Sequence, residues 1–371
     1  RWCAEQELSL RTGQRHAVEE EAGELARFYA WLQFLCDEQL AAAQRRAKEA
    51  GMRIGLVTDL AVGVHPGGAD AVNLAEYLAP QSSVGAPPDD YNQQGQDWSQ
   101  PPWHPVRLAE SGYRPWREML QTILRHSGGV RVDHILGLFR LFWIPRMTSP
   151  QNGTYVYYDY EAMLGILALE AQRAGAVLVG EDLGTLEPWI QHVLAETGVL
   201  GTSIVWFERA EDNESPLPQH AYRRLALASV GTHDLPPTLA YLRGEHIALR
   251  ARLGVLTRSV AEEVADDRKW QARLLNEVER TGLLPRREPE EEVVLALHRY
   301  IAGTPSALTS TSLVDMVGDV RAQNQPGTTK DLYPNWCVPL CDSTGTPVLI
   351  EDLESNEFFQ KMARASARRG D

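Results

Sequence analysis

Short apolar runs, each long enough for one buried strand, alternate with helical segments along most of this 371-residue chain. Six such runs occur, at residues 53–60, 130–133, 176–181, 202–207, 226–234 and 306–313. Runs that are apolar throughout and separated by helices are typical of parallel strands covered on both faces. The pattern therefore predicts an α/β fold built on parallel strands.

The segments between the runs have the spacing of helices. Residues 18–50 repeat large apolar side chains at helical intervals between charged faces, namely Phe28, Trp31, Leu32, Phe34 and Leu35. Gly51 stands where a helix commonly ends. The same reasoning predicts further helices at residues 115–126, 159–174, 187–197 and 257–281.

Acidic residues close four of the six runs, at Asp59, Asp133, Glu181 and Asp234. In a (β/α)8 barrel the carboxyl ends of the strands meet at one mouth, where the chemistry of such barrels is placed. An open doubly wound sheet also fits the alternation, but no G-x-G-x-x-G motif follows any run, so its dinucleotide-binding form loses its main support. We therefore predict a (β/α)8 barrel of the TIM type with long insertions.

The chain starts at Arg1 in what reads as mid-domain sequence. We expect residues 1–371 to form one catalytic barrel domain that lacks its first strands, so that six of the eight strands are present. Residues 61–114 combine Pro-Gly turns with tyrosine and tryptophan, which predicts an ordered, functional loop insertion. Residues 241–300 are charged and helical, and they predict a helical insertion on the outside.

Composition excludes several classes of function. The chain has 36 basic and 50 acidic residues, a net charge of −14, which argues against nucleic acid as a partner. No apolar run approaches the ~18 residues of a membrane span, because the longest, at 136–145, contains Arg140. The four cysteines form no zinc pattern and no calcium-loop motif occurs, so we expect neither a metal nor a cofactor.

The compartment we expect is the cytoplasm. The first 43 residues carry charges throughout and lack the apolar core of a signal peptide. The cysteines, at positions 3, 36, 337 and 341, are expected to be reduced thiols.

Three of the strand-end carboxylates suit the chemistry of a glycosidic bond. Asp133, Glu181 and Asp234 follow different strands, 48 and 53 positions apart. Cleavage of a glycosidic bond needs one carboxylate as nucleophile and one carboxylic acid as proton donor. Burial and neighbouring negative charge can keep the donor protonated near neutral pH. On their spacing alone, the three could equally be acidic turn residues or structural ion pairs.

The residues around these carboxylates resemble the sequence motifs of glycoside hydrolase family 77, the 4-α-glucanotransferases called amylomaltase or disproportionating enzyme. The resemblance extends from about residue 25 to 353. It rests on motifs in a fixed order: GAPPDDY at 85–91, GQDW at 95–98, GVRVDH at 129–134, GEDLG at 180–184, GTHD at 231–234, NQPGT at 324–328 and YPNW at 333–336.

The resemblance implies a role for each carboxylate. Asp133 is expected to be the nucleophile that forms a covalent glucosyl intermediate, and Glu181 to protonate the leaving sugar and then deprotonate the acceptor. Asp234 is expected to bind ring hydroxyls and stabilise the transition state. Arg131 is expected to keep Asp133 ionised.

The resemblance also implies a set of sugar-binding residues. Tyr91 and Trp98 offer flat faces for glucose rings, and Gln96 offers an amide for hydroxyls, so residues 61–114 are expected to hold a substrate-covering loop. Asp59, Asn324 and His233 are further expected contacts, while His134 is expected to pack structurally.

The implied activity is transfer of a segment of a 1,4-α-glucan to the 4-OH of an acceptor glucan or glucose, by a retaining double displacement. Maltooligosaccharides and linear α-glucans are the expected partners. Two alternatives stay open: an α-1,4-glucan hydrolase of the α-amylase type, and a truncated, inactive glucan-binding chain.

Overall fold

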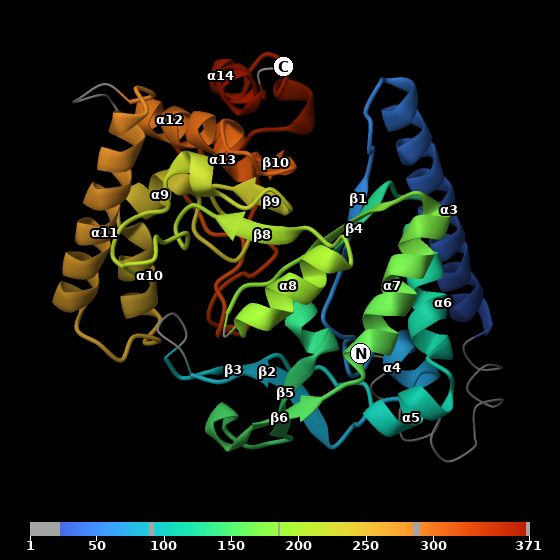
Figure 1. Ribbon diagram of the computed structural model, residues 1–371. Coiled ribbons are helices and arrows are strands. Elements are labelled where there is room, and N and C mark those ends of the chain that lie inside the picture. Colours follow the sequence, from blue (N-terminus) through green and yellow to red (C-terminus); the bar gives the residue numbers. More distant parts are fainter. Residues whose placement is uncertain (1–22, 89–92, 185, 285–289, 369–371) are drawn as a thin grey trace. The chain divides into compact units, whose positions relative to one another are not determined.

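The computed structural model describes residues 23–88, 93–184, 186–284 and 290–368, and the chain divides into two compact units (Figure 1). Unit 1 extends to Pro87 and continues over Gly95–Gly201, while unit 2 comprises Pro88–Gln94 and Thr202–Asp371. Each of the six apolar runs overlaps a strand. The α/β class is therefore confirmed, whereas membership of these strands in one eight-stranded barrel stays a prediction.

The centre of unit 1 is a three-stranded parallel sheet of order β1-β4-β7, with strands Val57–Leu60, Gly129–Val132 and Val177–Gly180. Its register aligns Asp59 with Arg131 and Arg131 with Val179. Parallel strands end at the same edge, so the residues that follow β4 and β7 leave the sheet as neighbours.

Two helices complete the core of unit 1. Helix α6 (Arg114–Leu124) and helix α7 (Tyr160–Ala174) pack on each other and contact the strands (Figure 1). Helix α7 begins where the Asp159 side chain accepts a hydrogen bond from the backbone of Ala162, and it ends at Gly175, whose φ of 65° suits glycine. The helices predicted near these positions are confirmed, as is α8 (Pro188–Glu196).

Helix α3 (Gly23–Glu49) is the described part of the helix predicted at 18–50. Its aromatic side chains do not enter a core formed by the described residues. Phe28 is 49% exposed, Trp31 52% and Phe34 58%. Helical spacing therefore predicted helix α3 correctly, but it did not predict the exposure of its aromatic side chains.

A second sheet of unit 1 is antiparallel, in the order β3-β2-β5-β6. Strands β2 (Ser82–Ala86) and β3 (Gln96–Asp97) come from the 61–114 insertion, whereas β5 (Arg140–Pro145) and β6 (Thr154–Tyr157) follow β4. The insertion also contains helices α4 (Ala69–Asn73) and α5 (Pro105–Glu110). At Gly85 a side chain would collide with the backbone carbonyl of Gln96, so glycine lets the two strands approach closely.

Unit 2 combines a small sheet with helices. The sheet has the order β10-β9-β8, with β9 (Ala226–Ser229) and β10 (Leu308–Ser310) parallel; β8 is Gly201–Ile204. The helices are α9 (Thr238–Leu242), α10 (Glu245–Arg252), α11 (Val260–Arg280), α12 (Glu290–Ala302), α13 (Leu313–Val317) and α14 (Glu357–Ser366). Within the described ranges, no helix has both the length and the apolar character needed to cross a membrane.

Leu167→Ala should lower the free energy of unfolding by about 2–5 kcal/mol, because its side chain is fully buried in the core of unit 1 and its removal leaves a cavity. Leu169→Ala is the matched control on the same helix. Leu169 is 43% exposed, so its loss should cost less than about 1 kcal/mol. Chemical unfolding of both variants measures the difference, and equal losses would contradict the assigned core.

Candidate active site

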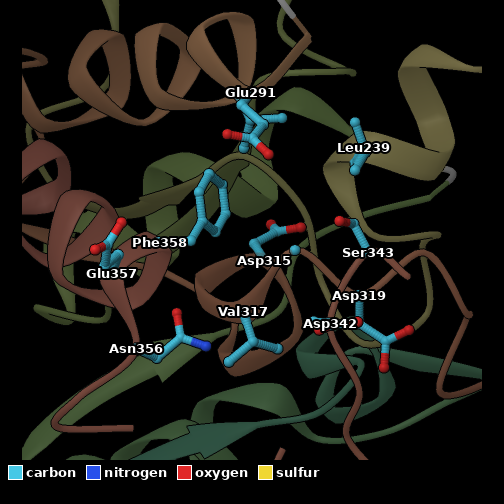
Figure 2. Close-up of a pocket in the computed structure, with 12 residues that line it drawn as sticks. Leu239, Glu291, Asp315, Val317, Asp319, Asp342, Ser343, Asn356, Glu357 and Phe358 are labelled. Atoms are coloured by element: carbon cyan, nitrogen blue, oxygen red, sulfur yellow. The ribbon is translucent and has the colours of Figure 1, made fainter. Parts of the chain in front are cut away.

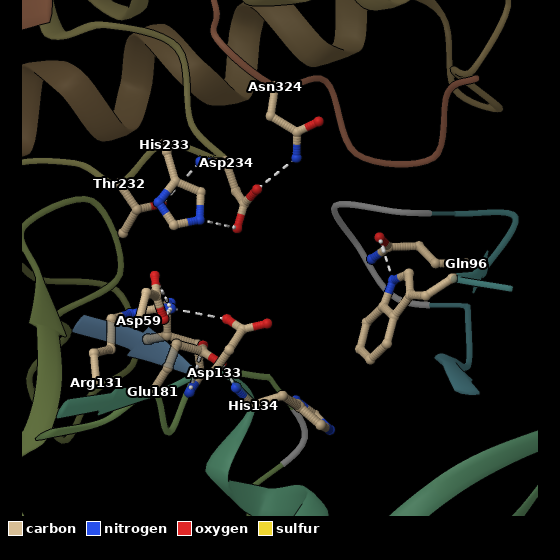
Figure 3. A network of polar contacts seen from close by, with 12 residues as sticks. Asp59, Gln96, Arg131, Asp133, His134, Glu181, Thr232, His233, Asp234 and Asn324 are labelled. Atoms are coloured by element: carbon tan, nitrogen blue, oxygen red, sulfur yellow. Dashed lines mark hydrogen bonds and ion pairs between the residues drawn. The ribbon is translucent and has the colours of Figure 1, made fainter. Parts of the chain in front are cut away.

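A chain of ion pairs lies at the carboxyl edge of the parallel sheet in unit 1. The Arg131 guanidinium donates to both carboxylate oxygens of Asp59, at 2.8 and 3.0 Å, and to Oδ1 of Asp133 at 3.0 Å (Figure 3). Parallel pairing explains the geometry, since Asp59 and Arg131 are in register and Asp133, the residue after β4, lies two positions beyond Arg131, on the same face. The structure thus brings these three predicted site residues together.

Arg131 is the positive centre of this group. Burial alone would lower the pKa of its guanidinium, but the negative charges of Asp59 and Asp133 outweigh burial, and the pKa is raised. Its side chain is 16% exposed, so solvent screens these pairs less than it would at the surface. A fixed positive charge next to Asp133 favours its carboxylate form, which is the form that a carboxylate nucleophile needs.

Glu181 follows β7 directly, and backbone groups hold both oxygens of its carboxylate. The His134 N–H donates to Oε2 at 3.0 Å, and the Leu183 N–H donates to Oε1 at 3.1 Å. Burial and then the charge of Asp133 raise the pKa of Glu181 from 4.5 to about 7, against the opposing effects of Arg131 and the two N–H donors. Glu181 can therefore carry a proton near neutral pH and also release it.

Aromatic and amide groups from the antiparallel sheet belong to unit 1 as well. The Trp98 indole N–H donates to Oε1 of Gln96 at 3.1 Å, and the Trp98 ring meets the His134 imidazole edge-on, with centroids 5.4 Å apart. Trp98 also packs beside the buried residues Val84 and Leu141. Trp98 is therefore a partly buried residue beside the core of the antiparallel sheet and a contact of His134. Tyr91, the other predicted aromatic, lies outside the described residues.

A separate polar group in unit 2 contains the remaining predicted residues (Figure 3). Asn324 donates from Nδ2 to Oδ1 of Asp234 at 2.6 Å, and Nε2 of His233 lies 3.3 Å from Oδ2 of the same carboxylate. The His233 ring also contacts Trp336, at 5.2 Å between centroids. Trp336 is 62% exposed with a φ of 63°. Its motif was recognised in the sequence, but the residue itself was missed as a candidate.

A cavity of about 280 Å³ in unit 2 contains none of the predicted site residues (Figure 2). Its wall is acidic, but structural contacts account for the buried carboxylates. Asp315 accepts hydrogen bonds from the backbone and hydroxyl of Thr238, and Asp319 pairs with Arg321. Throughout the described ranges, no group of three or more His, Cys, Asp or Glu side chains is arranged to hold a metal ion.

The predicted residues thus fall into two groups, one in each unit. Unit 1 supplies a carboxyl group paired with an arginine and a second carboxyl group whose pKa is raised to about 7. Unit 2 supplies a carboxylate oriented by an amide and a histidine. A carboxylate nucleophile and a neighbouring proton donor are the pair that retaining glycoside chemistry requires.

Comparisons with known proteins agree with this chemistry. A family profile described as 4-alpha-glucanotransferase matches residues 1–343. A 4-alpha-glucanotransferase of Mycobacterium tuberculosis is 55% identical over 343 residues, which cover 91% of this chain and 47% of the relative. One of Haemophilus influenzae is 33% identical over 340 residues, which cover 89% and 48%. The chain thus spans about half the length of these relatives.

Two solved structures resemble the chain. The crystal structure of amylomaltase from Corynebacterium glutamicum matches with a TM-score of 0.90 and 60% identity, over 99% of this chain and 54% of the other. Amylomaltase from Streptococcus agalactiae in complex with acarbose has a TM-score of 0.73 at 18% identity, over 96% and 66%, and shows a shared fold. Since the family profile covers most of its length, the chain belongs to the 4-alpha-glucanotransferase family, glycoside hydrolase family 77.

Proposed function

We propose that the enzyme to which this chain belongs is a 4-α-glucanotransferase that acts by a retaining double displacement. The observation that carries the proposal concerns Glu181. Its carboxyl group is bound by the backbone N–H of His134, the residue after Asp133, and burial and the charge of Asp133 raise its pKa to about 7. The names of the relatives support the same activity.

In the first step, Asp133 attacks the anomeric carbon of the donor glucan and forms a covalent glucosyl ester. The glycosidic oxygen leaves with the proton of Glu181, and the shortened glucan departs. In the second step, Glu181 takes the proton of the acceptor 4-OH while that oxygen attacks the ester carbon and frees Asp133. Two inversions at the same carbon retain its α configuration.

The proposal gives Asp234 the role of binding ring hydroxyls of the substrate as the transition state forms. Its contacts with Asn324 and His233 support this role, because they fix the direction of its carboxylate. It also includes a (β/α)8 barrel as the fold of the whole enzyme, which the parallel pairing of β1, β4 and β7 and of β9 with β10 supports.

Linear α-1,4-glucans are the proposed donors and acceptors. Trp98 and Gln96, joined by a hydrogen bond, offer an aromatic face and an amide on the insertion that precedes β4. Cytoplasmic α-glucan metabolism is the proposed setting. Hydrolysis is the second candidate, because water and a sugar hydroxyl can attack the same glucosyl ester.

The products from maltotriose separate the two activities. The full-length enzyme should convert maltotriose into glucose and longer oligosaccharides, because a sugar hydroxyl and not water resolves the ester. Chromatography of the products over time measures this. Maltose and glucose without any lengthening would favour the hydrolase.

Asp133→Asn should lower turnover of the full-length enzyme by at least about a thousandfold, because an amide does not form the ester. Glucan affinity, measured by calorimetry, should change less than about threefold, because the side chain keeps its shape. Asp266→Asn, at an exposed position on α11, is the control and should retain full turnover. Comparable turnover in Asp133→Asn would refute the assigned nucleophile.

Glu181→Gln should become more stable relative to the wild type as pH rises. The folded state raises the pKa of Glu181 from 4.5 to about 7, so ionisation penalises folding. The penalty is absent below pH 4.5, where the group is protonated in both states, and reaches about 3 kcal/mol above pH 7. Unfolding free energies measured from pH 4 to 8 test this.

The control for that series is Glu161→Gln, at an exposed position in the first turn of α7. Its stability relative to the wild type should stay nearly constant over the same pH range. If the stability of Glu181→Gln relative to the wild type were equally constant with pH, Glu181 would titrate as an ordinary carboxyl group.

A further inference from the structure

We infer that His134 is a positioning residue for Glu181, and that it acts through the left-handed conformation of its backbone. The inference rests on the proposed function, in which Glu181 is the proton donor and acceptor. His134 follows Asp133 directly, so a single turn of the chain after β4 serves both proposed catalytic carboxyl groups.

The chain at the end of β4 holds Glu181 at three points, and a fourth contact comes from Leu183. The Glu181 N–H donates to the carbonyl of Val132, and the Glu181 carbonyl accepts from the N–H of Ile135, both at 2.9 Å. Between these, the His134 N–H reaches Oε2 of the Glu181 side chain, and the Leu183 N–H holds Oε1. The backbone of residues 132–135 thereby fixes both the main chain and the carboxylate of Glu181.

This arrangement depends on an unusual backbone conformation. His134 has a φ of 45° and a ψ of 59°, a left-handed conformation that is sterically unfavourable for a residue with a Cβ. The turn lets the chain leave β4 and begin the 3₁₀ helix Ile135–Leu138, while the His134 N–H points at Glu181. Such an unfavourable backbone conformation persists only where surrounding contacts enforce it.

Two contacts enforce it here. Ile135, the next residue, is fully buried in the core of unit 1. The His134 imidazole packs edge-on against Trp98 of the antiparallel sheet. Burial lowers the pKa of this imidazole from 6.5 to about 4, so the ring is neutral at physiological pH and adds no charge beside Glu181.

The hydrogen bond from His134 affects the proton affinity of Glu181. An N–H donor favours the carboxylate form, and it acts in the same direction as the Leu183 N–H and the positive charge of Arg131. Burial and Asp133 act in the opposite direction. Loss of the His134 donor would therefore raise the pKa of Glu181 further, by about one unit if the bond has an ordinary strength.

A pair of variants isolates the backbone effect. His134→Gly and His134→Ala both remove the imidazole, and they differ by one methyl group. Glycine adopts the left-handed conformation at no steric cost, whereas alanine is pushed away from it. His134→Asn is a third variant, because asparagine tolerates this conformation and keeps a polar side chain.

In the full-length enzyme, we expect His134→Ala to have a kcat about tenfold below that of His134→Gly, with KM equal within about twofold. The alkaline limb of its kcat/KM profile should lie about one pH unit above the limb of His134→Gly. His134→Asn should follow the glycine variant. Equal kcat values and equal pH limbs for alanine and glycine would overturn the inference, as would an asparagine variant that follows alanine.

A readout without turnover separates this inference from the proposed function. The pH at which Glu181 destabilises the fold can be obtained from unfolding curves of each His134 variant, with and without Glu181→Gln. That midpoint should be about one pH unit higher in His134→Ala than in His134→Gly. A midpoint shift in an enzyme that does not lengthen maltotriose would support the positioning role and refute the activity, whereas an unshifted midpoint refutes the positioning role.

Discussion

The parallel pairing of β4 with β7 is the constraint on which the chemistry of unit 1 depends. It places the residues that follow the two strands next to each other, so that the backbone after Asp133 binds the carboxylate of Glu181. One carboxyl group is then beside a guanidinium and the other is buried among backbone donors. The same pairing therefore gives the two acids different surroundings, and only Glu181 has a pKa raised to about 7.

Arg131 extends this separation to a third acid. Its guanidinium binds Asp59 from β1 as well as Asp133 from its own strand. The carboxylate of Asp59 is bound to Arg131, so its contribution to the site in this structure is electrostatic: its negative charge raises the pKa of the Arg131 guanidinium. In the proposed reaction, a substitution at Asp59 would thus affect Asp133 through Arg131, in addition to any effect on sugar binding.

Local patterns in the sequence predicted the parts of unit 1 that depend on neighbouring residues. Each apolar run overlaps a strand, and the carboxylates after β4 and β7 could be identified because parallel strands end at a shared edge. The antiparallel sheet was not predicted, because β2 pairs with β5, which lies beyond β4 in the chain. Pairing over such a distance leaves no periodic signal within one segment.

The conformations and contacts of single residues could also not be predicted from the sequence. The left-handed turn at His134 was not foreseen, since histidine adopts many conformations and the residue was interpreted as structural packing. Trp336 was part of a recognised motif, but its contact with His233 is seen only in the folded structure. Helical spacing identified α3, whereas the exposure of Phe28 depends on what surrounds the helix.

Trapping of the glycosyl intermediate tests the central claim most directly. Full-length enzyme carrying Glu181→Gln would be incubated with an α-maltosyl fluoride, whose fluoride leaves without help from an acid, and then digested for mass spectrometry. The account predicts a maltosyl adduct on the peptide that contains Asp133. An adduct on another carboxylate, or a turnover that proceeds with no covalent adduct at all, would contradict it.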